Sequence, residues 1–414
     1  MDLNLIRGLF GVIALLAVAY LLSDNKKVIN WRTVGLAFVL QAVLGAFVLY
    51  IPMGKDVLTS ISSGVQNVID SANVGIAFLF GGLGSDEMYN NGVGFVFAVR
   101  VLPIIIFFSS LIAVLYYLGV MQFIIKIIGG PVQKLLATSK AESLSATANI
   151  FVGSTEAPLV IRPYIAKMSR SELFAIMVGG LASVAGSVLA GYAGLGVELK
   201  YLIAASFMAA PGGLLMAKMI VPETNSQVDE DGEVEEEKED DRPANVIDAA
   251  ASGASSGLKL AANVGAMLLA FIALITLLNT VISGCASMLG VDGITIEWIL
   301  GYLFVPFAFV IGIPFEEMLV AGSFIGQKMA VNEFFAYANF VEVKDTLTTS
   351  TQVIITFALC GFANLGSIAV LLGGIGTMAP NRRHDIAVLG FKAMLAATLA
   401  NLMSATLAGI FISL

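Results

Sequence analysis

The chain has 414 residues, of which 58% are hydrophobic and only 13% are charged, and its mean hydropathy is +0.90. Because a soluble domain carries about 25% charged residues, this composition excludes an ordinary soluble protein and predicts an all-α integral membrane protein. The net charge of −8 arises in one segment: residues 229–241 hold ten acidic residues and one lysine, so the rest of the chain sums to +1.

Eight membrane-spanning helices are predicted in chain order, because eight windows are long and apolar enough for a hydrocarbon core of ~30 Å. They lie near residues 3–22, 33–52, 93–118, 172–192, 199–220, 246–283, 348–372 and 385–412. Residues 55–70 place Val57, Ile61, Val65 and Val68 opposite a polar face, which is typical of a helix in the membrane interface. The acidic run between spans five and six is predicted to be a linker without regular structure.

Two further stretches, 138–168 and 297–325, are apolar but interrupted by Pro, Gly and Glu. Basic residues cluster after span one, between spans three and four, and between spans seven and eight. These loops share one face, predicted to be cytoplasmic with both termini outside, only if neither stretch crosses the membrane. We therefore predict two re-entrant hairpins, whose irregular backbone is tolerated where it lines a polar cavity.

The two hairpins belong to an internal repeat. With a shift of 160 residues, TEAPLVIRPYI (155–165) lies over FEEMLVAGSFI (315–325), and GLASVAGS (180–187) later resembles GFANLGSI (361–368). Three spans separate the hairpins, so the second copy enters from the opposite face. An inverted repeat with broken helices four and seven is typical of alternating-access secondary transporters.

Two intramembrane carboxylates, Glu156 and Glu333, are the leading candidates for contact with a substrate or an ion. Insertion of an ionisable residue into the middle of a membrane span costs about 2.5–3.5 kcal/mol of free energy, so a carboxylate at such a position indicates a functional role. The alternative is a salt bridge to Arg162 or Lys328 that only fixes helix packing. Glu316 and Glu317 are weaker candidates because they lie near a hairpin tip.

Small polar residues accompany the glycines of the two broken spans. Asn149 and Ser183, together with carbonyl oxygens of unwound backbone, suit Na⁺, although small residues also allow close helix packing. Phe362, beside Asn364 and Ser367, is either a core residue or a surface on which a flat ligand stacks.

The segments NIFVGSTEAPLVIRPY, GGLASVAG, PANVIDAA, VNEFFAY and CGFANLGSIA, in this order, resemble the bacterial concentrative nucleoside transporters over essentially the whole chain. The resemblance implies a multi-pass homotrimer of the bacterial inner membrane, with a scaffold and a moving transport domain. It assigns 1–54 to N-terminal peripheral helices, 55–72 to an interfacial helix, 93–130 to a scaffold helix, 138–220 to the first transport repeat, 221–243 to an acidic cytoplasmic linker, 244–285 to scaffold helix six and 297–414 to the second transport repeat.

The resemblance also implies uptake of a nucleoside such as uridine, driven by Na⁺, and a set of site residues. Thr155 and Glu156, with Gly153 and Ser154 beside them, would contact the nucleobase; Glu333, Asn364 and Ser367 would hold the ribose; Phe362 and Val188 would border the ligand; and Asn149, the Val152 carbonyl, Ser183 and the Val184 carbonyl would hold Na⁺. The family motif usually reads Gly-Gln-Thr-Glu, and Ser154 replaces its Gln here, which leaves the balance between purines and pyrimidines open.

Three rival functions remain to be weighed. A proton-coupled transporter of the same fold would use Glu156 or Glu333 to carry the proton. An intramembrane enzyme is disfavoured, because the chain shows no Cys/His cluster and no nucleophile elbow. A passive channel is disfavoured by the broken helices and the repeat. We expect a nucleoside and membrane lipid as partners, no nucleic acid, and Na⁺ as the coupling ion.

Overall fold

The computed structural model describes residues 3–84, 94–154, 156–224, 243–288, 290–291 and 293–414, and these ranges contain helices and no β-strand. Six helical stretches are long and apolar enough to cross a membrane: Trp31–Leu49, Phe97–Tyr117, Arg170–Leu195, Leu199–Ile220, Val246–Met288 and Pro380–Ile412. Four shorter apolar helices accompany them. The prediction of an all-α membrane protein is confirmed, whereas the acidic run at 229–241 and Thr155 lie outside the described residues.

The N-terminal part of the chain folds into α1 (Leu3–Leu21), α2 (Trp31–Leu49) and α3 (Pro52–Phe80). The predicted interfacial helix is the first part of α3, which continues through an apolar stretch to Phe80. The helix ends at Gly81, where φ is +57°, a conformation that favours glycine. The third predicted span consists of α5 (Phe97–Arg100) and α6 (Leu102–Tyr117), and Pro103 occupies the first turn of α6.

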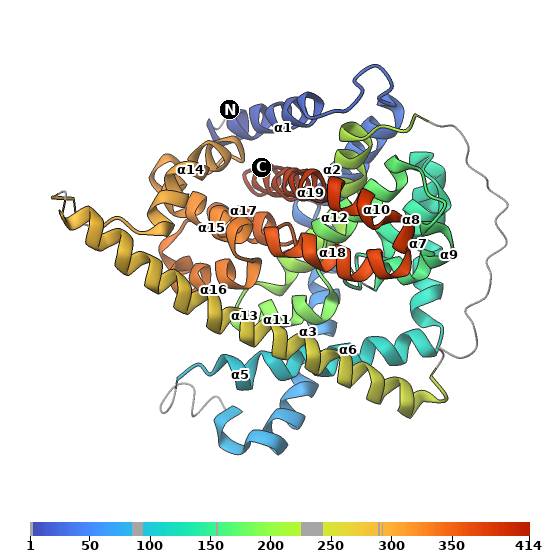
Figure 1. Ribbon diagram of the computed structural model, residues 1–414, viewed down its shortest axis with the longest axis horizontal. Helices are drawn as coiled ribbons and strands as arrows, with labels where there is room; N and C mark the ends of the chain where they lie inside the picture. The colour runs from blue at the N-terminus through green and yellow to red at the C-terminus, as the bar shows by residue number, and fades with distance from the viewer. Residues whose placement is uncertain (1–2, 85–93, 155, 225–242, 289, 292) are drawn as a thin grey trace.

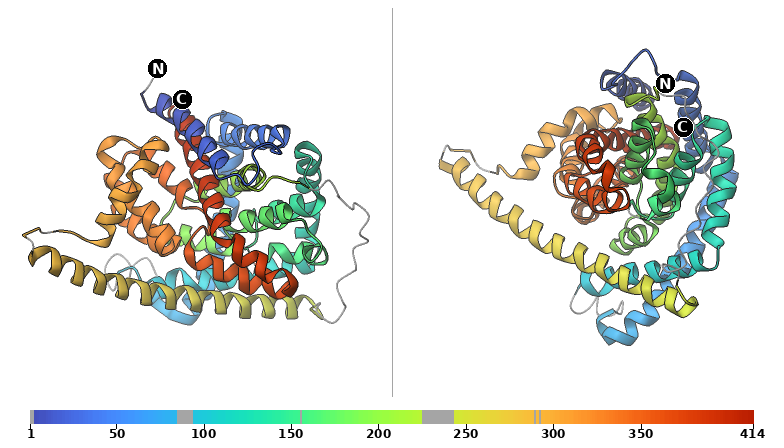
Figure 2. Two further views of the ribbon diagram at one scale, coloured as in Figure 1. Left: turned by 45° about the horizontal axis from the view of Figure 1, so that its top comes forward. Right: turned by 45° about the vertical axis from the view of Figure 1, so that its right-hand side comes forward.

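The longest helix is α13 (Val246–Met288), which lies along the outside of the molecule and packs on α6 (Figures 1 and 2). Small residues set the close approach of these two helices: a Cβ atom at Gly253 would lie 2.7 Å from the Ser109 carbonyl oxygen. The Ser110 hydroxyl donates a hydrogen bond of 2.8 Å to the Ala250 carbonyl. The opposite side of α13 exposes large apolar side chains such as Leu269 and Leu277.

Each predicted hairpin corresponds to a short antiparallel unit. The first comprises α8 (Lys140–Ala148), an irregular stretch, η2 (Ala157–Ile161) and α9 (Arg162–Ile165), and it follows α7 (Val120–Leu136). A capping box between Ser139 and Glu142 begins α8. The second comprises α14 (Ile296–Val310), η4 (Phe315–Glu317) and α15 (Met318–Ala330), which pack closely against each other.

Spans four and seven are both interrupted, as predicted. The fourth span is α10 (Arg170–Ala182) followed by α11 (Gly186–Leu195), and the seventh is α17 (Thr349–Leu359) followed by α18 (Leu365–Met378). Two continuous helices, α12 (Leu199–Ile220) and α19 (Arg383–Ile412), pack between these broken ones. The remaining elements are η1 (Gly81–Gly84), α16 (Glu333–Val343), η5 (Lys344–Thr346) and η6 (Pro380–Arg382).

Candidate functional site

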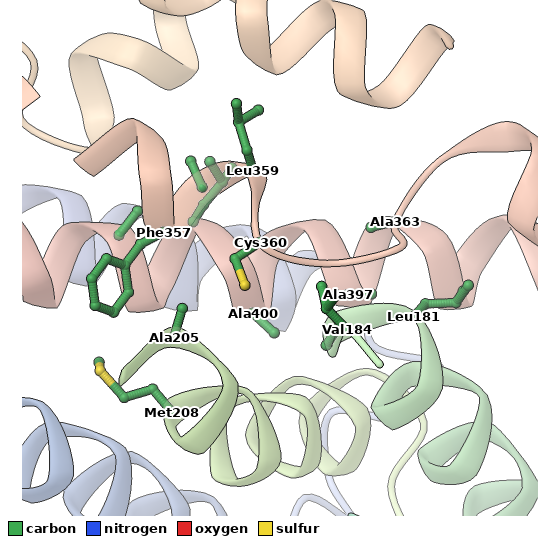
Figure 3. Packing of buried hydrophobic residues seen from close by; sticks show 14 of the residues in the cluster. Leu181, Val184, Ala205, Met208, Phe357, Leu359, Cys360, Ala363, Ala397 and Ala400 are labelled. Carbon is green, nitrogen blue, oxygen red and sulfur yellow. The ribbon is translucent and has the colours of Figure 1, made fainter. Parts of the chain in front are cut away.

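The two helix breaks lie next to each other at the centre of the fold. The Phe362 backbone N–H donates to the Ser183 carbonyl at 3.3 Å, so one break is hydrogen-bonded directly to the other. This approach needs a glycine, because a Cβ atom at Gly361 would lie 2.8 Å from the Ala182 carbonyl oxygen. Figure 3 shows Cys360 and Ala363 on the segment that crosses α19, with Leu181 and Val184 of the first break nearby.

The second break brings three predicted residues into one hydrogen-bonded group. Asn364 is the N-cap of α18: its Oδ1 atom accepts from the Ser367 backbone N–H at 2.9 Å and from the Ser367 hydroxyl at 3.0 Å. The Asn364 amide nitrogen donates to Glu333 Oε2 at 2.9 Å. Because the cap fixes which atom of Asn364 is the acceptor, its N–H group can only face the carboxylate. Glu333, at the start of α16, is 3% exposed.

Aromatic rings of α11 and α16 pack together beside Glu333. The Tyr192 ring of α11 lies with its centroid 4.7 Å from that of Phe334 and 4.6 Å from that of Tyr337. The Tyr192 hydroxyl lies beside the Glu333 carboxylate but completes no hydrogen bond of good geometry. Val188, one turn earlier on α11, is buried, and Phe362 is half-buried. Of the two predicted ligand-bordering residues, Val188 is therefore buried in the core, whereas Phe362 remains partly exposed.

The first hairpin places beside α10 a buried polar side chain that has no hydrogen-bond partner among the described residues. Asn149, at the C-cap of α8, is 1% exposed, and neither atom of its amide has a hydrogen-bond partner. The amide lies against α10, since its nitrogen is 3.2 Å from the position of a Cβ atom at Gly179. A buried polar group that stays unpaired costs about 1–3 kcal/mol. The position therefore calls for a ligand that the protein itself does not supply.

The neighbouring turns of the first hairpin and of the first break contain further oxygen atoms. The Phe151 carbonyl accepts from the Gly186 N–H at 2.9 Å, which places the turn of hairpin 1 against the start of α11. Val152 and Val184 are buried, and none of the described residues donates a hydrogen bond to either carbonyl. The Ser183 hydroxyl donates to the Gly179 carbonyl at 2.8 Å, which leaves its lone pairs available. Amide, hydroxyl and carbonyl oxygens suit a hard cation such as Na⁺.

The remaining residues of hairpin 1 line the same break. The Ser154 Cβ atom lies 3.0 Å from the position of a Cβ at Gly180, and Ala185 Cβ lies 3.3 Å from that of a Cβ at Gly153. Glu156 is exposed, and its Oε2 atom accepts from the Gly153 N–H at 3.3 Å. The predicted base-contacting segment thus lies beside the predicted ion-binding one. Two cavities of about 140 Å³ lie elsewhere, one along α3 and α11 and the other along α12 and α17.

Comparison with known proteins identifies the fold. Residues 201–409 match the family described as Na⁺ dependent nucleoside transporter C-terminus, residues 10–83 match its N-terminus, and residues 98–198 match a nucleoside recognition domain called Gate. The nucleoside permease NupC of Helicobacter pylori is 50% identical over 410 residues, which span 98% of this chain and 97% of NupC. The chain belongs to the Na⁺-dependent nucleoside transporter family. It is therefore a nucleoside transporter whose coupling ion is Na⁺, and not an enzyme.

Other members of this transporter family match over the full length. An uncharacterized transporter of Haemophilus influenzae is 54% identical over 418 residues, covering 100% of this chain and 99% of that protein. The structure of the transporter CNTnw in an inward-facing substrate-bound state has 57% identity and a TM-score of 0.94, covering 99% of this chain and 98% of that one. A CNTnw variant in an outward-facing state has 58% identity and a TM-score of 0.97, and both chains are covered completely.

Sequence reasoning missed two polar residues at the centre of this transporter. Lys328, considered only as a partner for a carboxylate, donates to the Ala358 carbonyl and to Asn401 Oδ1, both at 2.8 Å. Asn401, in the last helix, donates in turn to the Ala182 carbonyl at 2.7 Å and to the Cys360 carbonyl at 2.9 Å. A lone asparagine within an apolar span was the available signal, because membrane helices contain few such residues.

Proposed function

We propose that this protein is a symporter that couples inward movement of Na⁺ to nucleoside uptake across a bacterial inner membrane. The observation that carries the proposal is the pairing of two unlike half-sites: a buried Asn149 amide without a partner lies one helix break away from the hydrogen-bonded Glu333 and Asn364. Na⁺ suits the first half, and the hydroxyl groups of a ribose suit the second.

The residue roles follow from this arrangement. Asn149, Ser183 and the carbonyls of Val152 and Val184 would hold Na⁺. The ribose would donate to Glu333 and contact Asn364 and Ser367, with Phe362 and Val188 along the edge of the nucleoside. Gly153, Ser154, Thr155 and Glu156 would meet the base. Because the ion-binding and base-binding residues belong to one irregular stretch of hairpin 1, Na⁺ binding would order the segment that the base contacts.

Alternating access would proceed by elevator movement of a transport domain along a scaffold made of α6 and α13. In this proposal, the two hairpins re-enter the membrane from opposite faces, spans four, five, seven and eight move with them, and eight spans in all cross the membrane. Structures of CNTnw in inward-facing, intermediate and outward-facing states support such movement in the family. The exposed apolar face of α13 would contact lipid and the other protomers of a homotrimer.

Uptake into proteoliposomes tests the coupling. Labelled uridine should accumulate when an inward Na⁺ gradient is imposed and should not accumulate when K⁺ replaces Na⁺. Accumulation that ignores Na⁺ but follows an inward proton gradient would contradict Na⁺ symport and favour the proton-coupled alternative, with the substrate class retained. Absence of uptake under both gradients, with binding of uridine intact, would contradict a symport cycle.

A further inference from the structure

A buried cluster, which we call the carbonyl node, joins four helices between the two half-sites. It consists of Lys328 from α15, Asn401 from α19, and the carbonyl oxygens of Ala182, Ala358 and Cys360. Lys328 is 1% exposed and Asn401 is 2% exposed. All four hydrogen bonds of the node are between 2.7 and 2.9 Å long, so this is a tightly ordered group rather than an incidental contact.

The carbonyls of the node are those that helix geometry leaves without partners. Ala182 is the last residue of α10, while Ala358 and Cys360 flank Leu359, the last residue of α17. The final carbonyls of a helix have no intrahelical donor and carry its negative dipole end. In a membrane interior no water replaces the missing donors. The Lys328 ammonium and the Asn401 amide therefore satisfy both broken helices at the same point.

Asn401 uses its hydrogen-bonding capacity fully in this role. Its Oδ1 atom accepts from the Lys328 ammonium, which fixes the orientation of the amide, and its two N–H groups then reach one carbonyl from each break. An aspartate would lack both donors, and an apolar residue would leave the carbonyls unpaired. Glycine is needed at 361, because a Cβ atom there would clash with the Asn401 amide.

The carbonyl node adjoins both proposed binding sites along the chain but contains none of the residues proposed to contact Na⁺ or the nucleoside. Ala182 directly precedes Ser183 and Val184, which belong to the proposed Na⁺ site, and Cys360 lies two residues before Phe362, which borders the proposed nucleoside site. A second link runs parallel to it, from the Phe362 N–H to the Ser183 carbonyl. A shift of Ala182 when the first break closes on Na⁺ is thus transmitted through one amide to the backbone beside the nucleoside.

We propose that Asn401, oriented by Lys328, is the positioning residue through which Na⁺ binding raises the affinity for nucleoside. This inference rests on the proposed function, because it assigns Na⁺ to the first break and nucleoside to the second. It predicts a specific defect: without the Asn401 amide, each ligand still finds its own contacts, but the binding of one no longer prepares the site of the other.

The test measures coupling rather than affinity. Uridine Kd is determined by calorimetry on the purified protein in saturating Na⁺ and in K⁺, and their ratio is the coupling factor, expected to be about tenfold or more for the native chain. In Asn401→Ala, the Ala182 and Cys360 carbonyls lose their common donor, so the ratio should fall to about twofold. Thermodynamic linkage requires the effect of uridine on the Na⁺ Kd to fall by the same factor, a signature that mere loss of stability does not produce.

A matched control lies one turn further along α19. Ser404 is also 2% exposed and also forms an interhelical bond, accepting from the Gln41 amide at 2.8 Å, but it contacts neither break. Ser404→Ala should keep the native coupling factor even if its melting temperature drops. Should Asn401→Ala yield no folded protein, Asn401→Ser provides a smaller cavity, and its coupling factor should fall as well.

Three outcomes are distinguishable. A reduced coupling factor in folded Asn401 variants, with Ser404→Ala unchanged, supports the proposal. A native coupling factor in Asn401→Ala or Asn401→Ser overturns it, as does an equal loss in Ser404→Ala. A native chain whose uridine affinity ignores Na⁺ overturns the proposed Na⁺ symport itself, and with it this inference.

Discussion

Two buried asparagines beside the helix breaks differ in how their side chains are satisfied. At the second break, Asn364 is held by Ser367 and Glu333, so its side-chain oxygen and nitrogen both have partners within the protein. In the first hairpin, which packs against the first break, Asn149 is equally buried, yet neither polar atom of its amide has a hydrogen-bond partner among the described residues.

This difference shows which half of the site is prepared in advance. At the second break, the hydrogen bonds among Glu333, Asn364 and Ser367 already hold these side chains in place. A sugar can therefore bind by replacing some of these hydrogen bonds with its own. The buried Asn149 amide, by contrast, would become more stable by about 1–3 kcal/mol when a ligand provides a partner for it. In the proposed mechanism, Na⁺ therefore supplies the partner that the Asn149 amide lacks, whereas the nucleoside binds to side chains that are already hydrogen-bonded. Four substitutions test this contrast, from the largest expected effect to the smallest.

Glu333→Ala should remove most nucleoside affinity. Two charge-assisted hydrogen bonds from ribose hydroxyls are worth about 3 kcal/mol together, so uridine Kd should rise by roughly 100-fold. Calorimetry with uridine and with its 2′,3′-dideoxy analogue measures this, because the native chain should reject the analogue and the variant should not distinguish the two. Continued discrimination in the variant would remove Glu333 from the ribose site.

Asn149→Ala should weaken Na⁺ binding by roughly tenfold without destabilising the Na⁺-free protein, because the amide gives up no hydrogen bond. Thermal unfolding with and without Na⁺ separates the two effects: the Na⁺-induced rise in Tm should shrink, while Tm in K⁺ stays unchanged. Ser183→Ala is the comparison, since it loses a real bond to Gly179 and should lower Tm in K⁺. A large drop in K⁺ for Asn149→Ala would contradict the contrast between the breaks.

Ser154→Gln should alter base preference by roughly fivefold while leaving Na⁺ dependence intact. A longer amide side chain at this position reaches further toward the base and offers both a donor and an acceptor. Competition of uridine uptake by each natural nucleoside measures the change. If Ser154→Gln and Ser154→Ala give the same ranking of nucleosides as the native chain, this position does not select the base.

Glu317→Ala should have the smallest effect. Glu317 accepts from the backbone N–H and the hydroxyl of Thr348, at 2.8 and 2.9 Å, and so ties the tip of hairpin 2 to the start of α17. Its loss should lower Tm by roughly 2 °C with uridine affinity unchanged. Glu316→Ala is the matched control, because no hydrogen bond or ion pair of Glu316 is found among the described residues. A change in uridine Kd would give the hairpin tip a direct part in binding.

Local signals in the sequence were sufficient for the helix breaks and for most of the site. Glycines and small polar residues at equivalent repeat positions marked both breaks, and the carboxylate of Glu333 stood out because its type is costly in a membrane. The family resemblance groups Glu333 with Asn364, and the structure contains a hydrogen bond between their side chains, which nothing in the sequence shows.

Sequence patterns of this kind do not predict contacts between helices that are far apart in the chain. Asn401 lies 219 positions from its partner Ala182 and 73 from Lys328, so no spacing rule connects them. Lys328 is weighed from the sequence as a partner for a carboxylate; its ammonium is close enough to Glu333 for electrostatic attraction, but its hydrogen bonds go to the Ala358 carbonyl and to Asn401 Oδ1, which the sequence does not indicate. The end of α3 at Phe80 depended on a single glycine conformation, which an apolar stretch does not reveal.

The length of α13 has a consequence for the lipid around this transporter. Its 29 residues from Leu260 to Met288 contain no charged side chain and extend about 44 Å at 1.5 Å per residue, against a hydrocarbon core of ~30 Å. Hydrophobic mismatch of this size is relieved by steep tilting of the helix or by thickening of the bilayer. Thicker membranes would therefore hold α13 more upright, which makes acyl-chain length a variable that sets the tilt of this helix and of α6, on which it packs.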